Sequence, residues 1–181
     1  DEIILATYEG MSIRFHESDV REMGRTATGV RGIRLRTDDI VVGMVVVHHE
    51  TRDAATLLVV SEKGRGKRTA IDDYRFQSRG GMGVINLRVN DQTGKVVAIK
   101  SVSDPDELML ITRKGVVNRQ RVNEIRVIGR ATQGVRIVAL DEGDELMDVA
   151  RVVPEDEQPG DEQAALGDVP VDVSDIELTA A

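Results

Sequence analysis

The sequence predicts an all-β protein, a propeller-like array of about three four-stranded blades followed by a disordered acidic tail. Three observations predict it. A pattern of short apolar runs and glycine turns recurs about every fifty residues, the runs are rich in Val and Ile, and the best helical candidate, at 19–23, is one turn at most. Four-stranded units at such a period are typical of propeller blades.

Each repeat opens with an apolar strand that ends at a hairpin turn. The strands are IILAT at 3–7, LLVVS at 57–61 and LMLIT at 108–112. The glycines that close the turns, Gly10, Gly64 and Gly115, are 54 and 51 residues apart. Apolar runs followed by such a turn and a second strand pattern indicate β-hairpins.

A second marker keeps the same register. A glycine-rich element follows each hairpin and ends at Gly29, Gly83 or Gly134, again 54 and 51 residues apart. Two further strand patterns follow it, and the last of them are VVGMVV at 41–46, VVAI at 96–99 and LMDVA at 146–150. Two independent markers that shift together indicate true repeats. We place the blades at residues 1–51, 52–104 and 105–153.

Composition limits the class of protein. The sequence contains no Cys, which excludes disulfides and thiolate metal sites and fits a cytoplasmic protein. It has no apolar run of membrane-spanning length, so no membrane partner is expected. The chain starts at Asp1 and enters a strand at once, and we expect it to be a fragment of a longer protein. Neither a paired-carboxylate set nor a catalytic triad is evident.

The net charge of −8 conceals an uneven distribution. Residues 1–153 carry all 24 basic residues and 23 of the 32 acids, whereas residues 154–181 carry nine acids and no base. This tail cannot bury enough apolar surface to offset its ordering entropy, so we expect it to be disordered.

The basic residues gather in three arcs at equivalent places in the repeats. Residues 14–36, 63–79 and 113–136 hold 19 of the 24 bases and only six acids. We expect one strongly positive rim, which suits double-stranded DNA because Lys and Arg neutralise phosphates without reading sequence. Base stacking on single strands is not expected from two Tyr, two Phe and no Trp. The alternative is a basic face that is merely solvated.

The most glycine-rich element is QSRGGMG at 77–83. Gly80, Gly81 and Gly83 allow positive φ and close approach of another backbone. Successive amides in such a loop can bind a phosphate, and Arg79 adds a forked donor. A tight crossing between blades needs glycine for the same steric reason, so the residues alone leave both interpretations open.

This element resembles QRRGGKG, the box of the C-terminal domain of bacterial DNA gyrase A. The matching residues are Gln77, Arg79, Gly80, Gly81 and Gly83. Ser78 and Met82 replace an arginine and a lysine. GVRGIRL at 29–35 and KGVVNR at 114–119 resemble later repeats of the same domain, and the resemblance covers residues 1–153.

The resemblance implies a β-pinwheel, a propeller-like ring of about six blades that exchange strands, with DNA wrapped around the basic rim. It implies a non-catalytic part of an ATP-hydrolysing type II topoisomerase that introduces negative supercoils, assembled from gyrase A and gyrase B as an A2B2 heterotetramer. ATP and Mg²⁺ would act elsewhere in that holoenzyme, and this segment would need no cofactor or metal. Three units and an altered box imply the last half of the ring.

We expect the DNA contacts to come from the box and from bases of the three arcs. The predicted residues are Gln77, Arg79, Gly80, Gly81, Gly83, Lys67, Arg68, Arg25, Arg31, Arg119, Arg121, Arg130 and Arg136. The acidic tail, tethered nearby, would compete with DNA for the rim. Two other functions stay open: the equivalent C-terminal domain in topoisomerase IV, which lacks an intact box, and a propeller used only for protein contacts.

Overall fold

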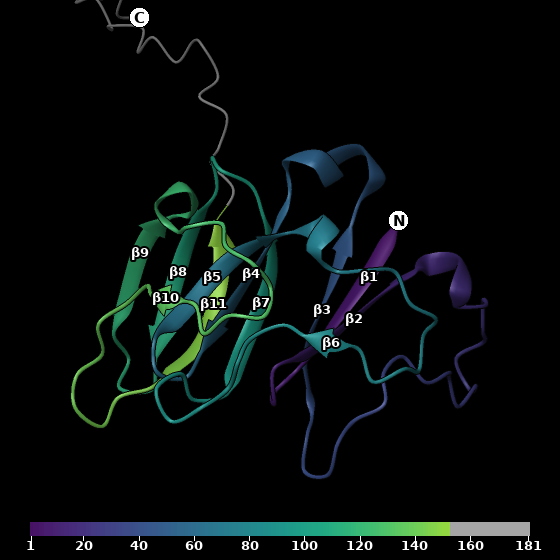
Figure 1. Ribbon diagram of the computed structural model, residues 1–181, viewed down its shortest axis with the longest axis horizontal. Coiled ribbons are helices and arrows are strands. Elements are labelled where there is room, and N and C mark those ends of the chain that lie inside the picture. Colours follow the sequence, from purple (N-terminus) through teal and green to yellow (C-terminus); the bar gives the residue numbers. More distant parts are fainter. Residues whose placement is uncertain (153–181) are drawn as a thin grey trace, which may run out of the picture.

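The computed structural model describes residues 1–152, which are built almost entirely of β-strands and loops (Figure 1). The predicted disordered tail, 154–181, lies outside the described residues. The strands are β1 (Glu2–Thr7), β2 (Met11–His16), β3 (Val41–Val47), β4 (Thr56–Ser61), β5 (Arg65–Ala70), β6 (Val84–Ile85), β7 (Val96–Val102), β8 (Glu107–Thr112), β9 (Val117–Arg121), β10 (Val135–Arg136) and β11 (Leu146–Val152). The short 3₁₀ helices are η1 (Glu17–Asp19), η2 (His49–Ala54), η3 (Ile71–Asp73) and η4 (Val122–Glu124). None of the helices described is long and apolar enough to cross a membrane.

The strands form three sheets, and every pairing between them is antiparallel. The strand orders are β3-β1-β2-β6, β10-β5-β4-β7 and β11-β8-β9. In each sheet the hairpin that opens the repeat pairs with the strand that closes it. The predicted all-β fold class is thereby confirmed.

The fourth strand of a sheet comes from the next repeat along the chain. The residue pairs are Met11↔Ile85 and Ser12↔Val84 between β2 and β6, and Gly66↔Val135 and Arg65↔Arg136 between β5 and β10. This is the strand exchange of a β-pinwheel, which the family resemblance implied and the repeat pattern alone did not show. Within the described residues the third sheet has only three strands, with β9 at its edge.

We call the segment that crosses to the preceding sheet the docking arm. It runs from the short 3₁₀ helix through the exchanged strand, at 71–87 in repeat 2 and 122–138 in repeat 3, and its counterpart in repeat 1 is 17–33. The hairpin turn beneath it requires glycine. Gly10 has a φ of +81°, and a Cβ there would clash with the carbonyl oxygen of Leu87 on the arm.

The hydrophobic core lies between neighbouring sheets. On β4, Leu57 and Val59 pack in the cluster shared with repeat 1, and Leu58 and Val60 pack in the cluster shared with repeat 3. Successive strand residues point to opposite faces, so a strand covered on both sides must be apolar throughout. The second sheet is therefore the middle layer of the three.

Candidate nucleic-acid interface

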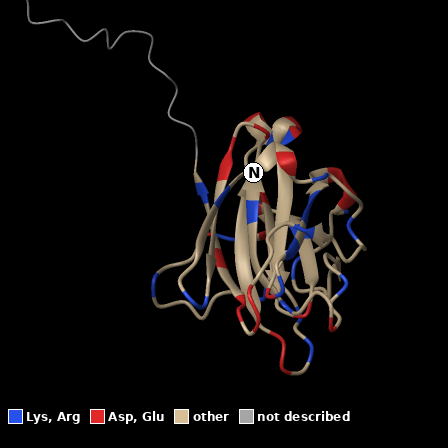
Figure 2. Cartoon of the chain, turned by 90° about the vertical axis from the view of Figure 1, so that its left-hand side faces the viewer, with Lys and Arg blue, Asp and Glu red and all other residues tan. Residues whose placement is uncertain are grey.

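The docking arms concentrate basic charge. Beyond their short helices, residues 74–87 and 125–138 contain five arginines and no Asp or Glu. Figure 2 shows that many of the acidic segments lie instead in connections at the ends of the sheets. The arms are therefore the surface on which a polyanion would find uncompensated positive charge.

Three arginines hold the same position in the three arms. Arg21, Arg75 and Arg126 are 54 and 51 residues apart, the spacing of the repeats themselves. All three side chains are exposed, and none makes a hydrogen bond or an ion pair within residues 1–152. A repeated, unpaired guanidinium is suited to contact successive phosphates of a backbone.

The local backbone explains why these arginines point outward. Each follows the residue that ends a 3₁₀ helix, and those residues, Val20, Tyr74 and Ile125, are extended. In extended chain, neighbouring side chains point to opposite sides. Tyr74 and Ile125 are buried in the core between sheets, so the arginine that follows each of them faces solvent.

Sequence reasoning did not select these three arginines. It counted bases over whole arcs, and the predicted contacts therefore included Arg25, Arg79 and Arg130 but not Arg21, Arg75 and Arg126. The repeat spacing of 54 and 51 was a signal that could have found them.

Arg79 and Arg130 occupy equivalent positions and brace one arm against the preceding arm. Arg79 Nε donates to the Asp19 carbonyl at 2.8 Å and its Nη1 to the Arg31 carbonyl at 3.2 Å. Arg130 repeats both bonds one blade later, to the carbonyls of Asp73 and Ile85. Both side chains are half-buried, so part of each guanidinium already serves the fold.

The glycine element is also engaged with the preceding repeat. Gln77 N donates to the Arg14 carbonyl at 2.9 Å, and Gly80 N donates to the Gly32 carbonyl at 2.5 Å. The Gly81 carbonyl accepts a bond of 2.8 Å from Arg34 N. A Cβ at Gly83, whose φ is +77°, would clash with the carbonyl oxygen of Ser12. The docking of blades therefore accounts for this element, and its contact with phosphate stays a prediction.

The structure places Lys67 inside the protein and not on the rim. Its side chain is fully buried on β5, and Nζ donates to the carbonyls of Gly129, at 2.8 Å, and Arg130 in the next arm. Burial, reinforced by the charge of Arg130, lowers the pKa of Lys67 to about 8. The arm of repeat 3 covers this lysine, so we no longer assign it a DNA contact.

Arg68 has a similar structural position. It is buried, its Nε donates to the Ile125 carbonyl at 2.8 Å, and its Nη1 lies 2.5 Å from Asp104 Oδ1. Arg14 holds the equivalent position one repeat earlier. It donates to the carbonyls of Ile71 and Tyr74 in the arm of repeat 2, at 3.0 and 2.8 Å. The Arg68 guanidinium is therefore committed to holding an arm, and the predicted DNA contact does not fit its position.

The other predicted contacts lie at the surface. Arg25, Arg31 and Arg136 are exposed within the arms. Arg119 and Arg121 are exposed on β9, where Arg119 forms an ion pair with Glu107. The structure thus leaves three predicted arm residues and the edge strand available to a partner.

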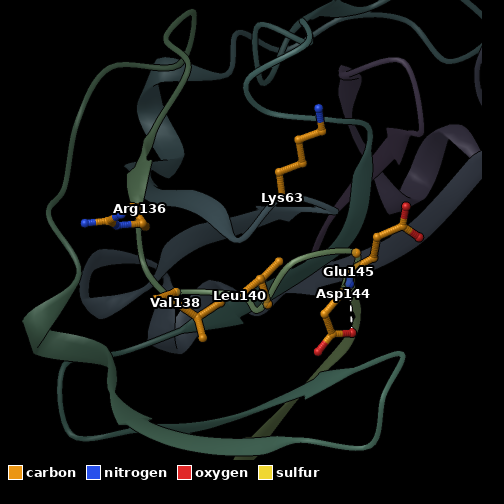
Figure 3. A pocket seen from close by; sticks show the side chains of 8 residues that line it. Lys63, Arg136, Val138, Leu140, Asp144 and Glu145 are labelled. Carbon is orange, nitrogen blue, oxygen red and sulfur yellow. Dashed lines mark hydrogen bonds between the residues drawn. The ribbon is translucent and has the colours of Figure 1, made fainter.

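Two pockets of similar size recur at equivalent places in the repeats. One, of about 420 Å³, lies between the turn of repeat 2 and the connection that follows β10, and Figure 3 shows basic Lys63 and Arg136 as well as acidic Asp144 and Glu145 around it. A pocket of about 410 Å³ lies at the equivalent place one repeat earlier, beside Gly10 and Leu87. The first pocket is lined by both basic and acidic residues, and an equivalent pocket recurs one repeat earlier. We therefore interpret these pockets as a consequence of the docking of blades and not as a dedicated ligand site. No group of three residues able to hold a metal ion occurs in residues 1–152.

Sheets completed by an arm from the next repeat define a β-propeller of the strand-exchanged, or β-pinwheel, class. The particular family follows from the sequence: the chain belongs to the family described as DNA gyrase C-terminal domain, beta-propeller, whose model matches residues 1–48, 55–103 and 106–152.

Curated relatives agree with this membership. DNA gyrase A of Lawsonia intracellularis is 50% identical over 143 residues, which are 79% of this chain and 17% of the relative. DNA gyrase A of Deinococcus deserti is 46% identical over 159 residues, which are 87% of this chain and 20% of the relative. The chain therefore spans about a fifth of the length of these relatives.

Solved structures share the fold. The DNA gyrase A C-terminal domain matches with a TM-score of 0.76 and 28% identity, covering 84% of this chain and 51% of that one. The C-terminal domain of DNA topoisomerase IV matches with a TM-score of 0.78 and 24% identity, covering 84% of this chain and 47% of that one.

Proposed function

We propose that this chain is a duplex-DNA-binding and DNA-wrapping module of DNA gyrase A. The observation that carries the proposal is the exposed, unpaired arginine at one position of three successive arms: Arg21, Arg75 and Arg126. A polyanion that follows the blades would meet one guanidinium per repeat. Membership of the DNA gyrase C-terminal domain family supports the same function.

Binding of this kind depends on the DNA backbone and on salt. Each arginine that neutralises a phosphate releases condensed counterions, without contact to the bases. A rim built from successive blades would bend the duplex along it, and the bending cost is offset by the added contacts. We expect the exposed arm residues Arg25, Arg31 and Arg136 to add to the same surface.

At the level of the whole protein, we propose that the module serves an ATP-dependent type II topoisomerase that introduces negative supercoils. Its partners would be the remainder of the gyrase A dimer and gyrase B, in an A2B2 assembly in the bacterial cytoplasm. The module would present wrapped DNA, while the catalytic tyrosine, ATP and Mg²⁺ would act in other parts of that assembly.

The test compares two triple variants of equal charge. Arg21→Gln, Arg75→Gln and Arg126→Gln together should weaken duplex binding and lower the slope of log affinity against log salt by about three, one for each lost phosphate contact. The control replaces Lys63, Arg113 and Lys114, which lie at hairpin turns, with Gln. Equal losses in both variants would contradict a specific role for the arms.

Wrapping needs its own readout. Relaxed circular plasmid is incubated with the chain and a type I topoisomerase, and the linking number is measured after the protein is removed. A shift that grows with bound protein supports wrapping. Bound DNA with an unchanged linking number would reduce the proposal to binding alone.

The sequence relatives favour gyrase over the topoisomerase IV alternative. Those named above are gyrase A proteins at 46–50% identity, whereas the solved topoisomerase IV domain is 24% identical and shows the shared fold alone. If the module served only protein contacts, both triple variants would bind DNA as the unmodified chain does. This outcome separates that function from the proposed DNA-binding function.

A further inference from the structure

One buried arginine binds the backbone on both sides of Arg75. The carbonyl of Tyr74, the residue before it, accepts from Arg14 Nη1 at 2.8 Å. Gln77 N, two residues after it, donates to the Arg14 carbonyl at 2.9 Å. Arg14 lies on β2 of the preceding repeat, and the carbonyl of Ile71 at the start of η3 accepts from the same Nη1 at 3.0 Å. The chain that carries Arg75 is therefore fixed by a residue of another blade.

The same arrangement recurs around Arg126. The carbonyl of Ile125 accepts from Arg68 Nε at 2.8 Å, and Ile128 N donates to the Arg68 carbonyl at 2.9 Å. Arg68 N donates in addition to the carbonyl of Arg126 itself, at 3.2 Å. Arg14 and Arg68 are 54 residues apart, the spacing of the first two repeats. Two successive joints thus hold the arginine of the arm by the same means.

Arg14 and Arg68, the holding arginines, are in turn each fixed by a carboxylate outside the arm. Arg14 Nε donates to Glu2 Oε2 at 2.7 Å, and Arg14 Cζ lies 4.0 Å from the centroid of the Phe76 ring in a cation–π contact. Arg68 Nη1 donates to Asp104 Oδ1 at 2.5 Å. A planar guanidinium that binds a carboxylate and a carbonyl at once has a defined orientation, because its donors diverge at fixed angles. Each joint therefore transmits that orientation to the backbone of the arm.

The residue that holds and the residue that is exposed are different in each joint. The side chains of Arg14 and Arg68 are 3% and 7% exposed, so neither can reach a phosphate. The side chains of Arg75 and Arg126 are exposed and make no hydrogen bond or ion pair within residues 1–152, so the backbone alone decides where they leave the surface. A backbone that is already ordered lowers the entropy that is lost when such a side chain binds a ligand.

We propose that the two holding arginines are positioning residues for DNA binding: Arg14 directs Arg75, and Arg68 directs Arg126. This role rests on the proposed function, because the two exposed arginines are its phosphate contacts. Each contact then depends on a buried residue of the preceding repeat, about sixty positions earlier in the sequence. Successive blades therefore do not contribute independently to the binding of DNA.

Lysine substitutions loosen the hold without changing the net charge. Arg14→Lys and Arg68→Lys keep one positive charge but replace the planar fork with a single ammonium, which cannot bind the carboxylate and the carbonyl in the same geometry. Each variant should weaken duplex binding several-fold, and by no more than Arg75→Gln or Arg126→Gln does. Because the charge is kept and the side chain is buried, such a loss cannot come from a missing phosphate contact of the holding arginine itself.

Double-mutant cycles show whether the loss of affinity passes through the exposed arginine. Arg14→Lys should cost little affinity when it is combined with Arg75→Gln, and Arg68→Lys should cost little when it is combined with Arg126→Gln. The crossed combinations, Arg14→Lys with Arg126→Gln and Arg68→Lys with Arg75→Gln, are the controls and should each show the product of the two single losses. Equal losses in matched and crossed combinations would overturn the proposal, as would lysine variants that bind duplex DNA like the unmodified chain.

Asp104→Ala provides a second variant, which leaves every bond between Arg68 and the arm in place. Removal of a negative charge should by itself strengthen DNA binding. Positioning predicts the opposite sign: weaker binding when Arg126 is present, and no weakening in Arg126→Gln. The control is Glu145→Ala, which removes an acid paired with Arg113 at a hairpin turn and should bind DNA at least as tightly as the unmodified chain. Unchanged or stronger binding by Asp104→Ala would overturn the proposal.

A measurement without DNA separates this proposal from the proposed function. In the folded chain, nitrogen relaxation of the backbone amide of Arg126 should show more motion in Arg68→Lys, with that of Arg75 unchanged. Equal motion at both amides would overturn the proposal, whether or not the chain binds DNA. If relaxation responds as expected but Arg75→Gln and Arg126→Gln bind duplex DNA normally, the proposed function fails, and the positioning role in DNA binding fails with it.

Discussion

The phenol of Tyr8 donates a hydrogen bond of 2.5 Å to Glu62, the residue at its own position one repeat later. The other carboxylate oxygen of Glu62 accepts from Lys95 N at 2.9 Å. In repeat 3 the same position is Arg113, which forms an ion pair of 2.9 Å with Glu145. The three equivalent residues are thus a tyrosine, a glutamate and an arginine. The hydrogen bond between Tyr8 and Glu62 joins neighbouring blades.

This bond predicts an unusual tyrosine titration. The hydrogen bond to Glu62, with burial as a second cause, raises the pKa of Tyr8 to about 12. An unfolded tyrosine titrates near pH 10, so the folded state keeps a proton that the unfolded state loses. Stability should therefore fall as the pH rises from about 10 to about 12. Urea unfolding at several alkaline pH values measures this fall.

The same titration can be followed by tyrosinate absorbance, because Tyr8 and Tyr74 are the two tyrosines and Trp is absent. Burial raises the pKa of Tyr74 as well. No phenol should ionise near pH 10 until the protein unfolds, and Tyr8→Phe should remove the earlier of two transitions. A full tyrosine titration near pH 10 in folded protein would contradict the prediction.

The repeats could be predicted because each glycine marker is a local feature of the sequence. Whether a basic side chain is buried or exposed depends instead on residues far away in the sequence. Gly10, Gly64 and Gly115 indicate the positions of the turns, because each ends a hairpin at a positive φ that residues with a side chain rarely adopt. By contrast, β5 reads RGKRTA, and nothing in that polar string shows that Lys67 and Arg68 are buried. Their cover is an arm about sixty residues away in the sequence, held by carbonyl acceptors that carry no sequence signal.

The lowered pKa of Lys67 predicts that the free energy of unfolding rises in mildly alkaline solution. Its folded pKa of about 8 lies below the ordinary value of 10.5, so between these values the unfolded state binds the proton and the folded state does not. Stability should increase as the pH rises from about 8 towards 10.5. Arg130 and Asp73 are the charged groups that act on Lys67. Urea unfolding of wild type and Lys67→Met should differ in this slope, and parallel slopes would refute the assignment.

The interior position of Lys67 separates its roles in folding and in DNA binding. Lys67→Met leaves the Gly129 and Arg130 carbonyls without their donor and should lower the free energy of unfolding by about 1–3 kcal/mol. It should leave the salt dependence of duplex binding unchanged. Arg75→Gln should do the opposite, lowering the salt slope by about one with little effect on stability. A reduced salt slope for folded Lys67→Met would return this lysine to the DNA surface.

Alanine substitutions at two glycines should separate the cost of backbone strain from the cost of losing arm docking. Gly29 and Gly83 have φ values of +86° and +77°, so alanine at either costs about 1–2 kcal/mol in the left-handed region. Only Gly83 also faces a carbonyl, that of Ser12, at a distance where a Cβ cannot fit. At low protein concentration, Gly29→Ala should lower the free energy of unfolding by about the strain alone. Gly83→Ala should lower it further, and hydrogen exchange should show β6 released from β2. Equal destabilisation by the two variants, with β6 still protected, would show that the arm docks without the close approach seen at Gly83.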